Sequence, residues 1–362
     1  MSDKIKNIVV TISFLLVIFV VLLVNIAKRD TIISLSERRE LQQFPKLSID
    51  TLLDGSFFEE FEKYTMDQFV QREAFRALKT KVEMDVLKKQ DSNHIYQYNE
   101  KLIEQIYPLN EKSIINTTNK MSEIYKRYLD QSNKIYYTIV PDKNYFVNEN
   151  HLKLDYHQLK ETMKENLKWA NYIEIFDCLE LSSYYATDSH WKQECLPKVV
   201  NRITDSMDIA IKTPYEEKKI VDFKGVYAGQ FPIPIESDEI KILTNDVIEN
   251  CIVYNYEANE KTKIYNMEKV NAPDKYDIYL SGATPLLTIE NSKNNSGKEL
   301  IVFRDSYGSS LIPLLVEGYS KITVIDTRYI SPKILNQYVD FYNKDILFVY
   351  STLLINNSIS LK

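Results

Sequence analysis

Two short segments of the chain carry residues that could together activate a serine. In "YYATDSHW", Tyr184–Trp191, Asp188 lies two positions before His190. In "LIVFRDSYGSSL", an apolar stretch, Leu300–Phe303, runs into Ser306 and then into a predicted helix. A serine hydroxyl is a weak nucleophile at neutral pH and needs a neighbouring base. The base in turn needs a carboxylate that holds it in one tautomer. The two segments therefore supply the three parts of a Ser–His–Asp site.

Each segment by itself also has a simpler interpretation. Ser306 stands at a strand-to-helix junction, where a serine commonly caps the helix N-terminus. The same junction can stabilise a developing oxyanion through its unpaired N–H groups. His190 alone is equally compatible with an ordinary core or surface histidine. Neither segment decides the question without the other.

Composition limits the classes of protein to which the chain can belong. Its 362 residues, 44% hydrophobic and 27% charged, supply a core for one large domain or two smaller ones. The net charge of -6 argues against nucleic acid as a partner. Neither the three cysteines nor the four histidines have the spacing of metal ligands, so we expect no metal and no cofactor.

The N-terminus contains a segment that we expect to cross a membrane. Between Lys6 and Lys28 lie about 21 uncharged residues, close to the roughly 20 that a helix needs to span a bilayer. The segment ends in "VNIAKRD" without a small-residue cleavage site, which favours an uncleaved anchor over a signal peptide. Because the tail before it is too short to fold, we expect the remaining chain to lie outside the cytoplasm.

Hydrophobic spacing predicts three parts along the chain. Residues 1–29 form the transmembrane anchor, and residues 30–109 form a stem and helical segment with aromatic residues at helical spacing. Residues 110–362 alternate strands with helices, which predicts an α/β domain with a parallel sheet covered on both faces. We expect an irregular insertion at about 215–276 within that domain.

The motifs "TDSHW" and "FRDSYGSS", together with the single anchor, resemble the DHHW-motif proteins. That family is similar to the alginate O-acetyltransferases of the SGNH hydrolase-like superfamily. The segments "SERRELQQFPKLS", "VPDKNYF", "YLSGATPLLTIEN" and "IDTRYI" extend the resemblance, in order, through most of the chain. It implies an SGNH hydrolase-like parallel sheet flanked by helices. It also implies a permuted topology, because ordinary SGNH esterases place the serine first.

The resemblance assigns roles to particular residues. Asp188, His190 and Ser306 take the catalytic positions, while Ser189 replaces the first histidine of the name-giving motif. Alginate acetyltransferases also carry a small hydroxyl residue there. SGNH enzymes stabilise the oxyanion with the serine N–H, a glycine N–H and an asparagine side chain. The candidates for the last two donors are Gly282 and either Asn356 or Asn357.

Further residues near predicted strand ends are candidates for substrate binding. They are Lys143, Trp191, Arg304, Arg328 and Tyr329. For each of them a structural role competes with the binding role. Lys143 also fits a plain turn, Arg304 fits an ion pair, and Trp191 fits packing beneath the histidine motif.

The implied activity is that of a membrane-anchored, extracytoplasmic O-acyltransferase, in particular an O-acetyltransferase, acting on a cell-surface polysaccharide. Because acetyl-CoA is cytoplasmic, the resemblance also implies a membrane-bound O-acyltransferase partner as the acyl donor. One alternative is a carbohydrate O-acetylesterase with the same triad, in which water takes the acyl group. Another is a non-enzymatic glycan-binding or envelope scaffold protein.

Overall fold

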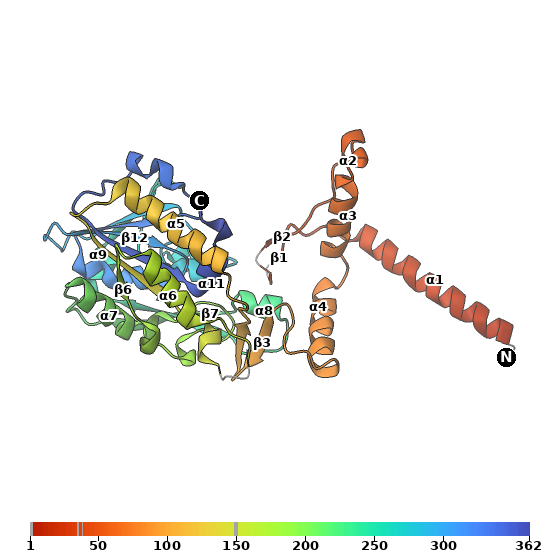
Figure 1. Cartoon of the computed structure of the whole chain (residues 1–362). Coiled ribbons are helices and arrows are strands. Elements are labelled where there is room, and N and C mark those ends of the chain that lie inside the picture. The colour runs from red at the N-terminus through yellow and green to blue at the C-terminus, as the bar shows by residue number, and fades with distance from the viewer. Residues whose placement is uncertain (1–2, 35, 38, 148–150) are drawn as a thin grey trace. The chain divides into compact units, whose positions relative to one another are not determined.

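The structure is a computed structural model that describes residues 3–34, 36–37, 39–147 and 151–362 (Figure 1). The chain divides into two compact units. The first consists of Met1–Asn93 and Ala228–Pro234, and the second of His94–Tyr227 and Ile235–Lys362. The short helix α8 (Val226–Gln230) spans a boundary between them in the sequence.

The first unit begins with the predicted apolar helix. Helix α1 (Asp3–Ala27) buries none of its residues within the structure and is long and apolar enough to cross a membrane. A two-stranded ribbon and three helices follow it. These elements are β1 (Ile33–Ser34), β2 (Arg39–Glu40), α2 (Ile49–Leu53), α3 (Ser56–Asp67) and α4 (Arg72–Lys81), which a π-helical turn, Val82–Val86, extends.

The second unit is built around an eight-stranded sheet. Across the sheet the strands lie in the order β10 (Glu260–Thr262), β9 (Ile252–Asn255), β11 (Leu286–Glu290), β13 (Lys321–Ile325), β12 (Glu299–Arg304), β14 (Asp345–Ser351), β5 (Lys134–Val140) and β6 (Asn171–Ile173). The strands from β13 to β6 are mutually parallel. The prediction of an α/β fold with a parallel sheet is therefore confirmed, and the sheet is mostly parallel.

One edge of the sheet departs from the parallel arrangement. Strands β10, β9 and β11 run antiparallel to their neighbours. Strands β9 and β10 are joined by a four-residue turn, which is too short for the crossover that parallel strands need. This edge lies partly in the segment at about 215–276 for which we expected an irregular insertion. The same segment also forms the hairpin of β7 (Glu216–Phe223) and β8 (Asp238–Thr244).

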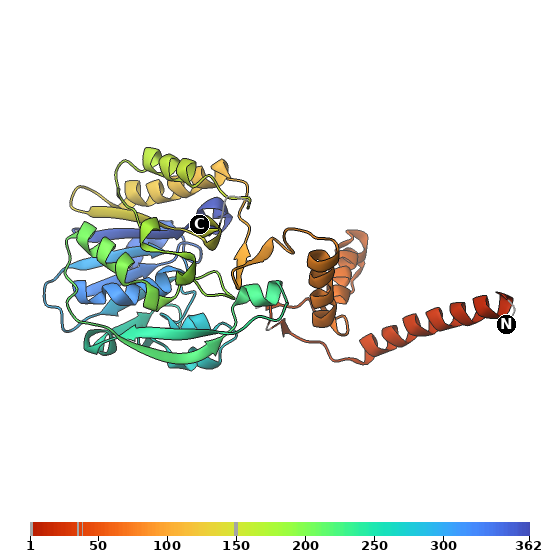
Figure 2. The same ribbon diagram turned by 90° about the horizontal axis from the view of Figure 1, so that it is seen from below.

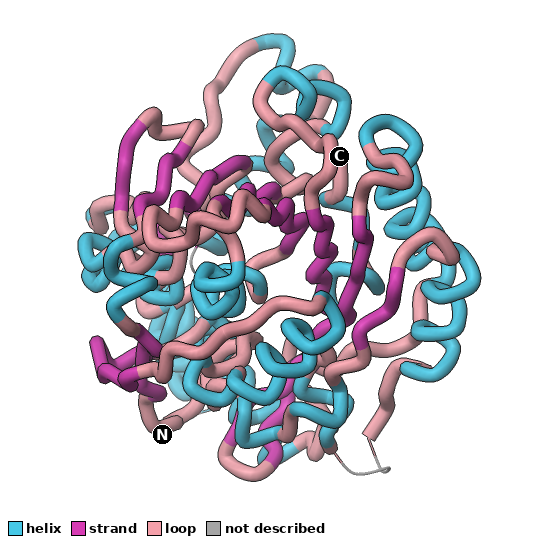
Figure 3. The backbone as a smooth tube through the Cα atoms, turned by 90° about the vertical axis from the view of Figure 1, so that its left-hand side faces the viewer, coloured by secondary structure: helices cyan, strands magenta, loops and turns pink. Residues whose placement is uncertain are grey.

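Helices cover both faces of the sheet, and Figure 3 shows them on either side of the strands. Side chains alternate along β5, so that Ile135, Tyr137 and Ile139 pack against α5 (Glu111–Tyr128) and α6 (Tyr156–Asn166). Tyr136 and Val140 belong to the core on the other face, with α7 (Pro197–Met207). The parallel strands are thus buried on both sides, as their continuous apolar sequences require.

Short elements complete the second unit. The hairpin of β3 (Ile95–Tyr98) and β4 (Lys101–Glu104) opens it. The short helices are α9 (Asp246–Asn250), α10 (Gly308–Leu311) and α11 (Thr352–Asn356). The 3₁₀ segments are Lys143–Phe146, Phe176–Cys178, Leu181–Ser183, Gln193–Cys195, Met267–Asn271, Lys275–Ile278, Ile312–Gly318, Pro332–Gln337 and Ser358–Ser360.

Parallel strands bring their carboxyl ends to one edge of the sheet. At that edge β5 leads into Lys143, β12 into Ser306 and β14 into α11. Open α/β sheets hold their ligands at this edge. The fold therefore collects the chain segments that the sequence marked as candidates for chemistry.

Candidate active site

The structure brings Asp188, His190 and Ser306 into one hydrogen-bonded row. His190 Nδ1 lies 2.5 Å from Asp188 Oδ1, and His190 Nε2 lies 2.7 Å from Ser306 Oγ. Because an ionised carboxylate can only accept, Nδ1 is the nitrogen that carries the proton in the neutral ring. Nε2 is then free to accept the proton of the serine hydroxyl. This is the arrangement in which an imidazole can activate a serine as a nucleophile.

The Asp188 carboxylate is fully buried and has donors on both oxygens. Its Oδ1 accepts from the His190 N–H at 3.1 Å as well as from the ring, and its Oδ2 accepts from the Val226 N–H at 3.0 Å. Gly225 leaves room for this contact, because a Cβ there would lie 2.2 Å from Asp188 Cβ. The carboxylate is thereby fixed in position without bulk solvent.

The loop that carries His190 is itself held at several points. Its ends pair as an isolated bridge between Tyr184 and Trp191, and the Tyr185 N–H donates to the His190 carbonyl at 3.1 Å. Asp238, on β8, accepts from the N–H groups of Ala186 and Thr187 at 2.7 and 2.8 Å. These hydrogen bonds hold the loop, and with it His190, in one conformation.

Ser306 occupies the turn between β12 and α10. Asp305 stabilises this turn, because its carboxylate accepts from the Tyr307 N–H at 3.1 Å and from the Ser351 N–H at 2.8 Å. Helix α10 has Tyr307 at its N-cap position, so Ser306 does not cap it. The Ser306 N–H has no hydrogen-bond acceptor within the described part of the chain, and the residue is partly exposed.

Two aromatic rings that the sequence did not mark as candidates pack against the imidazole. Tyr276 stacks on His190 with a centroid distance of 3.9 Å and an interplanar angle of 12°, and Tyr307 lies 4.9 Å away. The Tyr276 hydroxyl is 2.7 Å from Ser310 Oγ, and the Tyr307 hydroxyl donates to the Ser189 carbonyl at 2.8 Å. With 26 tyrosines in the chain, no sequence signal distinguished these two.

Trp191 and Arg304 are buried in the supporting structure. The Trp191 indole N–H lies 2.9 Å from Ser310 Oγ, beneath the motif, and its side chain is inaccessible to solvent. Arg304 is also fully buried, donates to the Gly282 carbonyl at 2.8 Å, and lies 3.6 Å from Asp326. Neither side chain is exposed to a ligand in solution, so we do not include them in the proposed substrate site.

The other candidate oxyanion donors are Gly282, Asn356 and Asn357. The first two already have hydrogen-bond partners, and Asn357 is exposed at the end of α11. The Gly282 N–H donates to the Tyr279 carbonyl at 3.1 Å. The Asn356 side chain accepts from the Asn110 N–H at 2.7 Å and donates to the Pro108 carbonyl at 3.1 Å. The Asn357 N–H donates within the last turn of α11, and the residue is exposed.

Two further candidates follow β13. Arg328 is paired with Asp326 through Nε at 2.9 Å and a terminal nitrogen at 2.7 Å. Its guanidinium lies over the Tyr329 ring, which is 47% exposed. Within the described residues, no group of three His, Cys, Asp or Glu side chains is arranged to hold a metal ion.

Lys143 lies beneath the histidine loop rather than at the surface. Its ammonium donates to the Tyr185 carbonyl at 3.1 Å and lies 4.9 Å from the centre of the Tyr227 ring. Burial lowers the pKa of Lys143 to about 7, although attraction to Asp188 acts in the opposite direction. The side chain thus contacts the support of the candidate site, not the space in front of Ser306.

The buried lysine predicts a particular pH dependence of stability. An unfolded lysine stays protonated up to about pH 10, so between pH 7 and 10 the unfolded chain binds more protons than the folded one. The free energy of unfolding should therefore rise between pH 7 and 10 by up to about 1.4 kcal/mol per pH unit, compared with that of the Lys143→Met variant. Chemical unfolding of both proteins in detergent at several pH values measures this difference. Parallel curves for the two proteins would contradict it.

The space at Gly225 gives a second prediction. In Gly225→Ala the new methyl group displaces the Asp188 carboxylate, so His190 loses its orientation and Ser306 its activation. We expect modification of Ser306 by a sulfonyl fluoride to slow at least about 100-fold. Gly318→Ala is the matched control, because its methyl group would contact the Ile209 side chain at 3.2 Å or more and lies in another part of the fold. Equal labelling rates in the two variants would show that the carboxylate position is unimportant.

The chain is similar in structure to a small set of solved proteins. No protein-family model and no curated protein matches its sequence. A DHHW family protein from Eubacterium siraeum superposes with a TM-score of 0.59 at 17% identity, covering 74% of this chain and 95% of that one. Bacillus cereus PatB1 with a sulfonyl adduct gives a TM-score of 0.58 at 16% identity, covering 72% of this chain and 95% of PatB1. The neighbours thus include the family that the motifs resemble, and at these identities the likeness shows a shared fold.

Proposed function

We propose that this protein is a membrane-anchored, extracytoplasmic O-acyltransferase, in particular an O-acetyltransferase, that modifies a cell-surface polysaccharide. The proposal depends above all on one observation, the continuous row from the Asp188 carboxylate through His190 to the Ser306 hydroxyl. A scaffold protein has no need for two segments, 116 residues apart, to meet in this geometry. The mutual hydrogen bonds therefore favour an enzyme over a scaffold.

In the proposed first half-reaction, Ser306 takes the acyl group from its donor. His190 Nε2 accepts the hydroxyl proton as Ser306 Oγ attacks the acyl carbonyl, and Asp188 stabilises the resulting imidazolium. The tetrahedral intermediate carries an oxyanion, for which the unpaired Ser306 N–H is the candidate donor. One such donor typically contributes about 3–4 kcal/mol to the transition state. Collapse of the intermediate releases the donor group, which takes the proton from His190, and leaves an acyl-serine.

In the proposed second half-reaction, a sugar hydroxyl takes the acyl group from the serine. His190 Nε2 now removes the proton of the acceptor hydroxyl, whose oxygen attacks the acyl-serine carbonyl. Collapse of the second intermediate breaks the bond to Ser306 Oγ, and His190 returns the proton to it. The same three side chains thus serve both half-reactions. If water replaces the sugar, the reaction becomes ester hydrolysis.

The membrane helix supports the location in the proposal. Helix α1 is long and apolar enough to cross a bilayer. In the proposal it anchors the protein, and the second unit lies outside the cytoplasm. Since activated acetyl groups are made in the cytoplasm, an integral membrane O-acyltransferase is the proposed partner that delivers the acyl group to Ser306.

PatB1, which shares the fold, has a solved structure with a sulfonyl adduct. If the candidate nucleophile of this chain is activated in the way we propose, a sulfonyl fluoride should modify Ser306. The chemistry of the site, not the likeness, carries the proposal.

Removal of the nucleophile tests the proposed mechanism. We expect Ser306→Ala to lower acyl transfer from an activated acetyl ester at least about 10⁴-fold, and His190→Gln to cost nearly as much. Asp188→Asn should cost about 10⁴-fold because the imidazole loses its correct tautomer. The control is Ser206→Ala, at an exposed serine on α7. Unchanged acetyl transfer by Ser306→Ala would falsify the acyl-serine mechanism.

The fate of the acetyl group separates transferase from esterase. An acetyl donor is supplied with and without an oligosaccharide, and the products are identified by mass spectrometry. We expect an O-acetylated oligosaccharide to form in preference to free acetate when the acceptor is present. Free acetate as the sole product across a panel of oligosaccharides would favour the esterase alternative.

A further inference from the structure

The helical part of the first unit exposes an unusual amount of apolar surface. Met66, Phe75, Leu78, Val86 and Leu87 are each more than half exposed, and Phe69 is 36% exposed. Water-soluble surfaces rarely gather so many large apolar side chains on one short segment. The segment therefore calls for a partner that covers it.

The exposed residues follow the spacing of one helix face. Phe75, Leu78 and Val82 recur at intervals of three and four residues along α4 and its π-helical extension. Charged residues, among them Arg76 and Lys79, occupy positions between them, and acidic residues such as Glu73 and Glu83 flank them. An apolar face beside a charged face is typical of helices that lie in a membrane interface.

Hydrogen bonds tie this segment to the end of α1. The side-chain oxygen of Asn25, in the last turns of α1, accepts from the Val70 N–H at 2.8 Å. Lys28 Nζ donates to the Gln68 carbonyl at 3.2 Å, and the Thr31 N–H donates to the Gln68 side chain at 2.9 Å. The turn between α3 and α4 therefore lies where the apolar helix ends. Figures 1 and 2 show α3 and α4 running across the line of α1 rather than continuing it.

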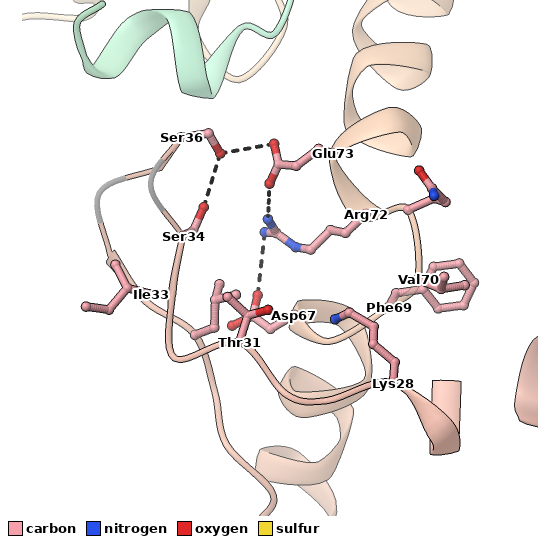
Figure 4. A pocket seen from close by; sticks show the side chains of 12 residues that line it. Lys28, Thr31, Ile33, Ser34, Ser36, Asp67, Phe69, Val70, Arg72 and Glu73 are labelled. Carbon is pink, nitrogen blue, oxygen red and sulfur yellow. Dashed lines mark hydrogen bonds and ion pairs between the residues drawn. The ribbon is translucent and has the colours of Figure 1, made fainter. Parts of the chain in front are cut away.

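A shallow groove of about 620 Å³ on α3 and α4 combines apolar and basic groups. Its lining consists of Thr65, Met66, Phe69, Arg72, Phe75, Arg76 and Lys79, and it includes no carboxylate. The two arginines form ion pairs with Glu37 and Glu73. Figure 4 shows Arg72 with Glu73 and Asp67 beside a neighbouring hollow, with Phe69 pointing away from it.

These observations favour a lipid surface as the partner. Glu37 and Glu73 already pair with Arg72 and Arg76, so the exposed basic group of the groove is Lys79, whose side chain is 55% exposed. The interfacial region of a bilayer accepts aromatic side chains and long basic ones. The groove also adjoins the end of the one helix that is apolar enough to enter the bilayer, among the described residues.

We propose that the face formed by Met66, Phe69, Phe75 and Leu78 rests in the headgroup region of the bilayer that α1 crosses. This interfacial face makes the stem a part of the membrane attachment, in addition to α1. The inference rests on the membrane anchor of the proposed function. It does not depend on the chemistry at Ser306.

Photolabelling of the full chain tests the interfacial face. The protein is reconstituted in vesicles of phosphatidylcholine and phosphatidylglycerol that contain a phospholipid with a diazirine near its headgroup. After irradiation, labelled peptides are identified by mass spectrometry. We expect label in α1 and also in residues 66–79. Replacing Phe69, Phe75 and Leu78 together by Ser should lower label in 66–79 several-fold and leave label in α1 unchanged.

The control variant is Ile359→Ser, which removes an exposed apolar residue of the second unit and should change neither signal. Label in α1 but none in residues 66–79 of the unsubstituted protein would overturn the interfacial face and leave the anchor intact. Cross-links between two chains at residues 66–79 would overturn it in favour of self-association. Absence of label from α1 would overturn both the interfacial face and the anchor, without bearing on the reaction at Ser306.

Discussion

The buried Asp188 carboxylate is the constraint on which the candidate site depends. A carboxylate away from water is costly unless donors satisfy its oxygens. Here the donors include the His190 ring, the backbone N–H groups of His190 and Val226, and the Ser189 hydroxyl at 3.5 Å. Each of them must be positioned by the fold before the charge can be accommodated. The tight turn of the histidine loop, the glycine at 225 and the bracing by Asp238 are parts of that requirement.

The sequence predicted the elements whose signal is local. Apolar runs of β-branched and aromatic residues located β5, β12 and β14, and the uninterrupted apolar segment located α1. The spacing of Asp188 and His190 was also readable, because both residues lie in one short loop. These features depend on residues close together in the chain, where periodicity and composition are informative.

Features that depend on distant contacts were beyond the same analysis. Nothing near Gly225 or Tyr276 indicates that one makes room for Asp188 and the other stacks on His190. The chain has only seven glycines, and this scarcity was the one signal that could have drawn attention to Gly225. The antiparallel edge was missed because strand direction depends on which neighbour a strand meets. Arg304 and Lys143 lie at or just after strand ends, where substrate-binding residues are common. Both are nevertheless buried and hydrogen-bonded to backbone carbonyls.

The pairing of His190 with Asp188 limits the route by which protons travel in the proposed reaction. An imidazole exchanges protons at its two nitrogens, in the plane of the ring, and Asp188 holds Nδ1 while Tyr276 stacks on one face of the ring. Only the Nε2 edge remains to meet a reacting oxygen. In the proposed reaction the departing group of the donor and the acceptor hydroxyl then exchange protons with the same nitrogen, one after the other. The geometry at His190 thereby matches a double-displacement cycle.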